Sequence, residues 1–337
     1  MRILVIGGSG FIGTRLISQW REDGHELVNL DIQQSSTHPD VTVIGDVRTP
    51  QDVRSAAGGD QPVDAVVLLA AEHRDDVRPL SLYEEVNVGG ARTVVQVCTD
   101  LGIDRIVFTS SVAIYGLDVG RPSESSPAHP FNEYGRTKLA AERVLSEWAG
   151  QDPGRSLFIV RPCVVFGERN RGNVYSLARQ IASRKFLFIG KGANRKAMGY
   201  VGNVVGFLAT GLAAPAGVQV TNYADTPDLT TRELVDIISA HLGHKRLAIP
   251  PIPRPLGMLG GYVFDAVARL TGRTFPISAI RIKKFTAETL VDTSRLQASG
   301  YRPPYSLPDA LGRTLDAEFP GGRVPADDGE GVYGASQ

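Results

Sequence analysis

Short apolar runs alternate with helix-like patterns over the first half of the chain. Most of the runs are continuously apolar, which is typical of parallel strands covered on both faces. Candidate strands lie at Arg2–Gly7, Glu26–Asp31, Val41–Gly45, Ala65–Leu69, Arg105–Ser110 and Ser156–Arg161. Amphipathic helices fit between them, at Gly10–Asp23, Thr49–Gly58, Tyr83–Leu101 and Glu133–Gly150. This order predicts an α/β fold built on a doubly wound parallel sheet.

The pattern changes after Gly167 and predicts a smaller C-terminal lobe. A helix at Val174–Arg184, a short strand at Phe186–Ile189 and a strand at Val218–Tyr223 are expected. Thr230 and Glu233 form a capping box before the next helix, which ends near Gly243. We therefore assign residues 1–167 to a large domain, with 199–225 returning to it, and 168–198 and 226–318 to the lobe. The Gly- and Asp-rich tail, 319–337, is expected to be disordered.

One later segment, Pro255–Leu270, is fairly apolar and predicts an amphipathic helix. We expect it to pack on the lobe, and contact with a membrane surface is the alternative. Arg281, Lys283 and Lys284 follow it as a small basic cluster, interpreted as a solvated face that could also attract an anionic substrate. Because no apolar run reaches about 18 residues, no membrane span is expected.

The composition limits which binding partners and which cellular compartment are expected for the protein. The 337 residues include 36 Lys and Arg and 36 Asp and Glu, so the chain as a whole has no attraction for nucleic acid or an anionic membrane, although a local patch could still exist. Its two cysteines, Cys98 and Cys163, lie in apolar segments and show neither disulfide nor metal-ligand spacing. No secretory signal opens the sequence. A cytoplasmic protein without a metal site is expected.

A glycine-rich turn joins the first strand to the first helix. Gly7, Gly10 and Gly13 are spaced three apart. In such a turn the first glycine allows a tight bend, the second lets the backbone approach a pyrophosphate, and the third allows close helix–strand packing. The helix N-terminus adds free N–H groups and a partial positive charge. The large domain is therefore predicted to be a Rossmann domain that binds a dinucleotide.

Asp31 ends the second strand, 18 residues beyond Gly13. A carboxylate there can accept hydrogen bonds from the adenine ribose and would repel a 2′-phosphate. The predicted cofactor is therefore NAD rather than NADP. Asp46 follows the third strand, where it can lie near the adenine edge.

Three residues indicate redox chemistry at a carbinol. Tyr134 and Lys138 are one helical turn apart on a face that continues with apolar residues, and Ser111 follows the fifth strand. Because ligands bind at the carboxyl ends of parallel strands, these side chains are expected to converge there. We expect Lys138 and a positive nicotinamide ring to lower the pKa of Tyr134 from its ordinary value near 10. Tyr134 would then exchange a proton with a carbinol oxygen held by Ser111.

These motifs together resemble the extended short-chain dehydrogenase/reductase superfamily, and within it the NAD-dependent nucleotide-sugar epimerase/dehydratase family. The resemblance rests on the glycine turn, Leu69-Ala70-Ala71, Asn87, Ser110-Ser111-x-x-x-Tyr115-Gly116, Tyr134-x-x-x-Lys138 and Arg161-Pro162. It implies a homodimer formed through the helices at Tyr83–Leu101 and Glu133–Gly150. It also implies which residues bind the cofactor. Phe11 and Ile12 would lie along the pyrophosphate, and Asp46 and Val47 would flank adenine. Lys138 would hold the nicotinamide ribose, Pro162 would lie near the carboxamide, and the cleft would be lined by Leu69, Ala70, Ala71 and Asn87.

The residues after Ser111 narrow the reaction. The dehydratase and decarboxylase branches of the family use acidic residues here, whereas this chain has Val112-Ala113-Ile114. The prediction is an NAD-dependent 4-epimerase of a UDP-hexose or UDP-N-acetylhexosamine, acting through a 4-keto intermediate. An NAD(P)H-dependent 4-keto-sugar-nucleotide reductase remains the main alternative. A 3β-hydroxysteroid-type dehydrogenase and a dinucleotide sensor without catalysis remain open as well.

One departure from the family leaves the sugar undetermined. Two residues past the Pro162 position the family usually has an Asn that contacts the nucleotide-sugar, and here that residue is Val164. Asn173 and Arg195 are the predicted substitutes. The loop that ends at Arg195 resembles the family segment whose arginine meets the diphosphate, a role that suits the planar guanidinium.

Overall fold

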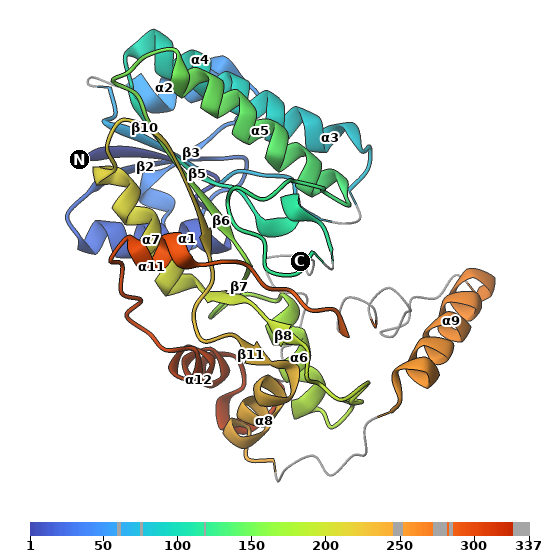
Figure 1. The fold of residues 1–337 in the computed structure, drawn as a ribbon. Coiled ribbons are helices and arrows are strands. Elements are labelled where there is room, and N and C mark those ends of the chain that lie inside the picture. Colours follow the sequence, from blue (N-terminus) through green and yellow to red (C-terminus); the bar gives the residue numbers. More distant parts are fainter. Residues whose placement is uncertain are drawn as a thin grey trace.

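A seven-stranded parallel sheet forms the centre of the larger domain (Figure 1). The computed structural model describes residues 1–58, 62–74, 77–117, 119–244, 252–271, 282 and 286–325. The strand order is β10-β6-β5-β4-β1-β2-β3. Successive strands are added on one side of β1 up to β3 and on its other side from β4 onward, which is the change in strand order that defines a doubly wound sheet. The predicted fold class is confirmed. The strands are β1 (Arg2–Ile6), β2 (Glu26–Asp31), β3 (Thr42–Ile44), β4 (Ala65–Leu68), β5 (Arg105–Thr109), β6 (Ser156–Pro162) and β10 (Gly217–Tyr223).

Helices cover both faces of this sheet. Side chains alternate along β1, so that Ile3 and Val5 enter one apolar cluster and Leu4 and Ile6 the other. Continuous apolar runs are therefore required wherever both faces are covered. On one face lie α1 (Phe11–Glu22) and α7 (Val201–Thr210), and on the other lie α2 (Pro50–Gly58), α4 (Gly90–Leu101) and α5 (Glu133–Gly150). A short helix α3 (Ser81–Tyr83) and a π-helical segment η2 (Glu84–Gly89) lead into α4, and the 3₁₀ segments are η1 (Pro39–Val41), η3 (Val112–Tyr115), η4 (Gly211–Ala213) and η5 (Pro320–Gly322).

The smaller lobe combines two-stranded sheets with helices. Its capping box is present, because the Thr230 hydroxyl accepts from the Glu233 N–H at 3.1 Å and the Glu233 carboxylate accepts from the Thr230 N–H at 2.7 Å. The strands pair as β7 (Val164–Phe166) with β9 (Met198–Tyr200) and β8 (Arg195–Lys196) with β11 (Leu229–Thr230). The helices are α6 (Asn173–Ala182), α8 (Thr231–His241), α9 (Arg254–Thr271) and α12 (Leu307–Glu318). The short helix α11 (Ser294–Ala298), from the segment assigned to the lobe, packs instead against β10 of the larger domain (Figure 1).

The strand predicted at Phe186–Ile189 is wrong. Only Ile189 forms a bridge, with Ile252. Phe186 and Phe188 are buried and meet edge to face at 5.8 Å between ring centroids. Two apolar residues separated by one position are typical of a strand. In the described part of the chain, these two side chains pack in the core without their backbone joining a sheet.

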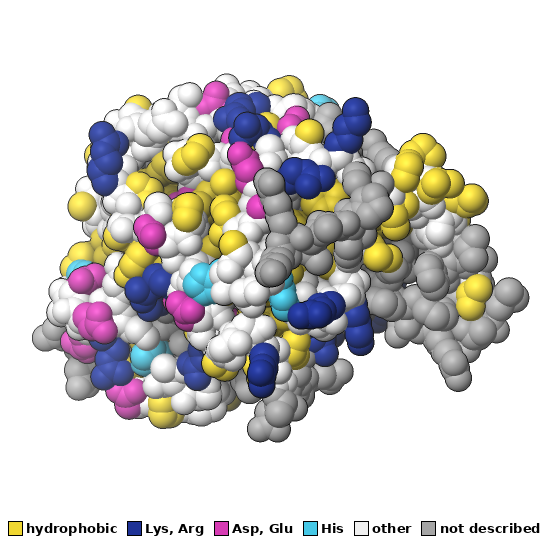
Figure 2. Space-filling view, turned by 90° about the horizontal axis from the view of Figure 1, so that it is seen from below, with side chains coloured by type: hydrophobic (Ala, Val, Ile, Leu, Met, Phe, Trp, Pro, Cys, Tyr) yellow, Lys and Arg dark blue, Asp and Glu magenta, His cyan; other side chains and the backbone are white. Residues whose placement is uncertain are grey.

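The helix predicted near Pro255–Leu270 is present as α9, but several of its described apolar side chains do not pack on the lobe as expected. Leu256, Leu259 and Tyr262 are 59%, 62% and 61% exposed. Figure 1 shows α9 standing away from the rest of the lobe, and Figure 2 shows hydrophobic side chains gathered on this projecting part. None of the described helices is long and apolar enough to cross a membrane. The basic cluster Arg281, Lys283 and Lys284 lies outside the described residues.

The chain remains packed beyond α12. Phe319 is buried and stacks on Tyr175, with 5.2 Å between ring centroids. The ordered part therefore extends past the expected start of the tail, and residues 326–337 lie outside the described residues.

Candidate active site

The glycine turn between β1 and α1 has the geometry of a phosphate cradle. Gly7 has φ of +87°, and a Cβ there would lie 2.5 Å from the Ala70 nitrogen. A Cβ on Gly13 would lie 2.4 Å from the Gly8 Cα. At Gly10 the nearest atom would be 3.5 Å away, and no side chain caps the first turn of α1. The N–H groups of that turn are thus available to a pyrophosphate, which fits a dinucleotide.

Two polar side chains of β2 fix this turn. The Asp31 carboxylate accepts from the N–H groups of Ser9 at 2.9 Å and Gln33 at 3.0 Å, and it remains partly exposed. Asn29 is fully buried, and its Oδ1 accepts from the Gly8 N–H at 2.8 Å. Sequence reasoning missed Asn29, although an Asn inside an otherwise apolar strand is a signal for such a contact.

The segment after β3 holds Asp46 and Val47. The Arg48 guanidinium lies 2.6 Å from the Asp46 carboxylate, and its hydrogen bond lowers the pKa of Asp46. Val47 is buried against Gly90 of α4. This places both residues beside the sheet edge that carries the glycine turn, and their predicted contact with adenine stays a prediction.

Asn87 holds the segment that follows β4 rather than standing free in a cleft. Its Oδ1 accepts from the Glu72 N–H at 2.7 Å, and its Nδ2 donates to the Glu72 carbonyl at 3.0 Å and to the Thr137 hydroxyl at 2.9 Å. Thr137 lies on α5 between Tyr134 and Lys138. The side chain therefore joins the Leu69–Ala71 strand end to the helix that carries the predicted catalytic residues.

Ser111 and Tyr134 are brought together from two elements. The Ser111 hydroxyl caps η3 by accepting from the Ala113 N–H at 3.1 Å, and it lies close enough to the Tyr134 phenol to act on the pKa of that group. A Cβ on Gly135 would lie 2.6 Å from the Ala113 carbonyl oxygen. Only a glycine at that position lets α5 approach η3 closely enough for this pair.

Lys138 lies buried beneath the tyrosine. Its Nζ donates to the Thr109 carbonyl at 2.7 Å and lies 4.6 Å from the centre of the Phe108 ring. Burial lowers the pKa of Lys138 to about 7, although Glu142, one turn along α5, acts in the opposite direction.

Burial also raises the pKa of Tyr134 to about 12, and the hydrogen bond with Ser111 opposes this only in part. The expectation that Lys138 lowers this pKa is therefore wrong for the protein alone, because burial disfavours both the phenolate and the ammonium. A further positive charge is needed to favour the phenolate, and the oxidised nicotinamide ring supplies one when NAD is bound.

The lysine makes the stability of the cofactor-free protein depend on pH. Its folded pKa of about 7 lies below the ordinary 10.5, so the unfolded chain binds more protons between these values. Stability therefore rises with pH in this window, by roughly 1 kcal/mol per pH unit. We expect urea unfolding at about pH 7.5 and 9.5 to show a steeper rise for the parent than for Lys138→Met.

The exposed Lys185 provides the control for this measurement, and Lys185→Met should keep the parental slope. Tyr134 is present in all three proteins, so its own titration contributes equally to each and cancels in the comparison. Equal slopes for the parent and Lys138→Met would contradict the assigned burial of the charge.

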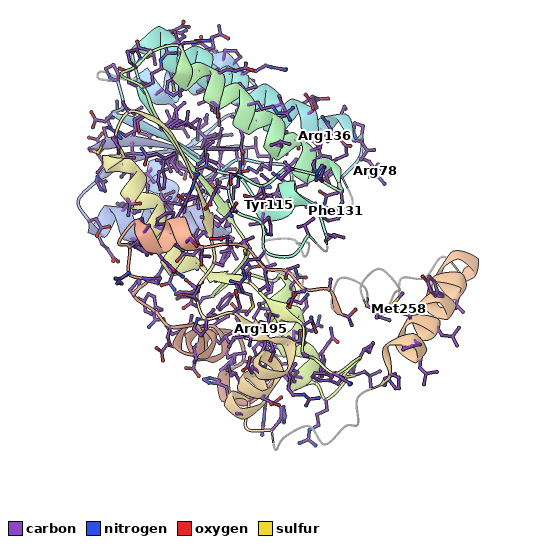
Figure 3. All side chains as sticks on the ribbon, viewed as in Figure 1. Arg78, Tyr115, Phe131, Arg136, Arg195 and Met258 are labelled. Carbon is purple, nitrogen blue, oxygen red and sulfur yellow. The ribbon has the colours of Figure 1, made fainter. Side chains whose placement is uncertain are left out.

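The predicted substrate residues lie on the smaller lobe. Asn173 is exposed at the first position of α6, and Arg195 is exposed on β8, where its Nη1 donates to the Asp228 carbonyl at 2.6 Å. Figure 3 shows Arg195 on this lobe, apart from Tyr115 and Phe131 on the larger domain. Val164 opens β7 and pairs with Met198. The structure thus joins Ser111, Tyr134 and Lys138 but leaves Asn173 and Arg195 on a separate lobe.

Tyr115 and Arg161, two residues of the family-like motifs, belong to a buried network. The Arg161 guanidinium donates to both Glu142 carboxylate oxygens at 2.9 and 2.6 Å and to the Tyr115 hydroxyl at 2.7 Å. That hydroxyl donates to Asn222 Oδ1 at 2.8 Å. Because Glu142 is one turn beyond Lys138, the network fixes α5 on β6 and β10.

The packing of the glycine turn predicts the effect of adding one methyl group. Gly13→Ala places a Cβ against backbone atoms, so α1 must move away from the turn and the phosphate cradle widens. We expect the purified variant to retain about tenfold less NAD, measured after release with denaturant. Gly58→Ala is the control, because nothing lies within 4 Å of its Cβ. Parental NAD content in Gly13→Ala would disprove the cradle.

Among the described residues, no group of three or more His, Cys, Asp or Glu side chains is placed to hold a metal ion.

Comparison with known proteins gives consistent matches along nearly the whole chain. A model of the NAD dependent epimerase/dehydratase family matches residues 3–223. An N-acetyl-α-D-glucosaminyl-diphospho-ditrans,octacis-undecaprenol 4-epimerase of Escherichia coli O157:H7 is 49% identical, over 94% of this chain and 95% of the relative. A UDP-glucose 4-epimerase of Vibrio cholerae is 29% identical, over 94% of each.

A solved structure shows the same fold. The Thermus thermophilus UDP-glucose 4-epimerase in complex with NAD superposes with a TM-score of 0.72 at 24% identity, over 94% of this chain and 98% of that one. Together the matches confirm the predicted enzyme and its NAD cofactor, and they agree with the predicted NAD-dependent nucleotide-sugar 4-epimerase.

Proposed function

This chain belongs to the NAD-dependent epimerase/dehydratase family, and we propose that it epimerises C4 of an N-acetylhexosamine joined through a diphosphate to a polyprenol. The observation that carries the catalytic part is that Ser111, which follows β5, and the buried Lys138, which donates to the Thr109 carbonyl at the end of β5, lie with Tyr134 at the carboxyl end of that strand. The Escherichia coli relative, which matches over nearly its full length, supports the polyprenol. A UDP-linked sugar, as predicted above, is the second candidate and is supported by the Vibrio cholerae relative. Both candidates share a sugar 1-diphosphate.

The chemistry follows from the positions of the three side chains. Tyr134, as phenolate, accepts the proton of the C4 hydroxyl as that carbon becomes a ketone, and Ser111 donates a hydrogen bond to the same oxygen. NAD supplies the hydride acceptor and donor at C4. Once the ketone has presented its other face, Tyr134 returns the proton. Lys138 is fixed by the Thr109 carbonyl, and from there it would hold the nicotinamide ribose of NAD.

The binding residues remain as proposed from the sequence. NAD would be held by Gly7, Gly10, Phe11, Ile12, Gly13, Asp31, Asp46, Val47, Leu69, Ala70, Ala71, Asn87, Tyr134, Lys138 and Pro162. Asn173 and Arg195 would close on the diphosphate from the smaller lobe. Val164 stands where a nucleotide-sugar contact is usual, which favours a carrier other than a nucleotide.

A homodimer through α4 and α5 is likewise proposed. A groove of about 560 Å³ runs between these helices on their outer side. Its lining combines apolar side chains with charged ones, and a second copy of the same face would cover it. The apolar residues are Val88, Val95, Ala140, Val144 and Trp148, and the charged ones are Glu84, Arg92, Asp100, Arg143 and Glu147. A cytoplasmic location is also proposed, supported by the dependence on NAD and by the free, buried Cys98 and Cys163.

The test compares substrates without added cofactor. The purified protein is incubated with undecaprenyl-diphospho-N-acetylglucosamine in detergent and, separately, with UDP-N-acetylglucosamine. We expect the C4 epimer of the first to accumulate without net formation of reduced NAD. Faster turnover of the UDP-sugar would favour the second candidate. Activity only with NADH and a 4-keto sugar would show a reductase instead.

A further inference from the structure

Among the described side chains of α9, four large apolar ones are exposed and lie on one side of the helix. Leu256, Leu259, Tyr262 and Val267 are 59%, 62%, 61% and 37% exposed. They follow one another at intervals of three, three and five residues, which at 3.6 residues per turn keeps them within one sector. Isolated exposed apolar residues are common, but such a gathering on one projecting helix marks an interaction surface (Figure 2).

The described contacts between the lobe and this helix lie near the start of the helix. Gly190 N–H donates to the Ile252 carbonyl at 2.9 Å, and Ile252 N–H donates to the Phe188 carbonyl at 2.7 Å. A Cβ on Gly257 would lie 2.7 Å from the Ile189 side chain. From there α9 extends away from the body of the molecule (Figure 1), so its exposed face is presented without rearrangement of the fold.

The charge around this helix differs from that of the rest of the chain. Between residues 245 and 284 the sequence contains eight basic residues and one acidic residue, Asp265, a net charge of +7. The whole chain has a net charge of zero, so the remainder carries −7. The basic residues are Lys245, Arg246, Arg254, Arg269, Arg273, Arg281, Lys283 and Lys284. An apolar helix face inside a basic segment is the pattern of a helix that lies in the surface of an anionic bilayer.

We propose that α9 docks on an anionic phospholipid membrane, with Leu256, Leu259, Tyr262 and Val267 entering the lipid headgroup region. This inference rests on the proposed function. The polyprenyl chain of the proposed substrate is held in the bilayer, so only the diphosphate and the sugar can reach Tyr134, and the enzyme must work at the membrane surface. In Figure 3, Phe131, three residues before Tyr134, lies on the side of the larger domain that faces α9 and Met258. Docking through α9 therefore brings the membrane surface to the side on which the catalytic helix begins.

A membrane fits these observations better than a second copy of the chain. The groove between α4 and α5 is the face already proposed for a second copy. Two basic segments of the same sign would repel each other, whereas phosphatidylglycerol headgroups attract them.

The binding test uses the full-length protein and vesicles without substrate. We expect it to sediment with phosphatidylcholine–phosphatidylglycerol vesicles at low salt, and less with phosphatidylcholine alone or at high salt. Leu256→Ser/Leu259→Ser/Tyr262→Ser should lower the bound fraction about tenfold. Arg281→Gln/Lys283→Gln/Lys284→Gln should lower it on the anionic vesicles only.

The control variant is Val43→Ser/Leu80→Ser/Val218→Ser, which removes three exposed apolar side chains elsewhere and should bind like the parent. Absence of vesicle binding by the parent, or an equal loss in this control, would overturn the proposal. A third outcome would also overturn it: if the parent is an oligomer in ultracentrifugation and the α9 variant is a monomer that still binds vesicles like the parent. The apolar face would then contact a second copy of the chain.

Reaction rates distinguish a failure of this inference from a failure of the proposed function. The α9 variant should lose about tenfold in rate on the undecaprenyl substrate in vesicles, yet keep the parental rate on a water-soluble analogue with a short prenyl chain. Turnover in detergent without any vesicle binding would overturn the docking alone. Vesicle binding by a protein that acts only on UDP-sugars would overturn the polyprenol assignment alone.

Discussion

Tyr134→Phe is expected to lower kcat by about 10³-fold and to leave KM and the bound NAD nearly unchanged. The phenol is the proton acceptor and donor at C4 in the proposed mechanism, and phenylalanine keeps its ring but not its hydroxyl. In the proposed mechanism, the neighbouring Ser111 would hold the same reacting oxygen. Steady-state rates of epimer formation, with NAD released and quantified from the same preparations, provide the measurement.

Tyr301→Phe is the matched control, because it removes a hydroxyl that donates to the Asn203 carbonyl at 2.8 Å, elsewhere in the fold. It should retain the parental kcat. If Tyr134→Phe also turned over at a rate close to the parent, the proton would have to move through another group, and the assignment of Tyr134 would fail.

Arg161→Met is expected to cost about 3–5 kcal/mol of folding stability, because it leaves the Glu142 carboxylate buried without its partner. The two side chains are 9% and 6% exposed and joined by two hydrogen bonds. Urea unfolding of the cofactor-free proteins measures the loss. Activity should fall as well, since Glu142 lies one turn beyond Lys138 on the same helix.

A surface pair provides the comparison. Arg21 and Asp40 are 2.9 Å apart and 42% and 55% exposed, so Arg21→Met should cost less than about 1 kcal/mol. Arg161→Met/Glu142→Leu, which removes both buried charges, should recover much of the lost stability. Equal losses for Arg161→Met and Arg21→Met would show that the network does not stabilise α5.

Local patterns in the sequence determined the fold class and the centre of the site. Continuous apolar runs require strands covered on both faces, and the glycine spacing specifies a turn whose contacts are all within a few residues or between neighbouring strands. Tyr134 and Lys138 share a helix face by their spacing alone. The capping box at Thr230 and Glu233 is equally local and was found at its predicted position.

Tertiary packing decided the features that depend on distant residues. Phe186 and Phe188 have the spacing of a strand, but a strand also needs a partner. The described structure offers this segment only a single bridge, between Ile189 and Ile252, which the spacing could not show. The pKa values of Tyr134 and Lys138 both follow from burial, which only the assembled fold sets, and this reversed the expected direction for Tyr134. The network of Arg161 with Glu142 and Tyr115 likewise joins residues far apart in the chain.

The same distinction holds for α9. Its apolar and polar positions predicted an amphipathic helix, and they gave no information on which surface the apolar face meets. That depends on whether the fold places another element opposite it, and the structure leaves Leu256, Leu259 and Tyr262 facing outward. The sequence thus determined a dinucleotide-binding redox enzyme, because its motifs are local in the chain. Only the tertiary structure decided how the catalytic groups are charged and which surface is presented, because burial is a property of the whole fold.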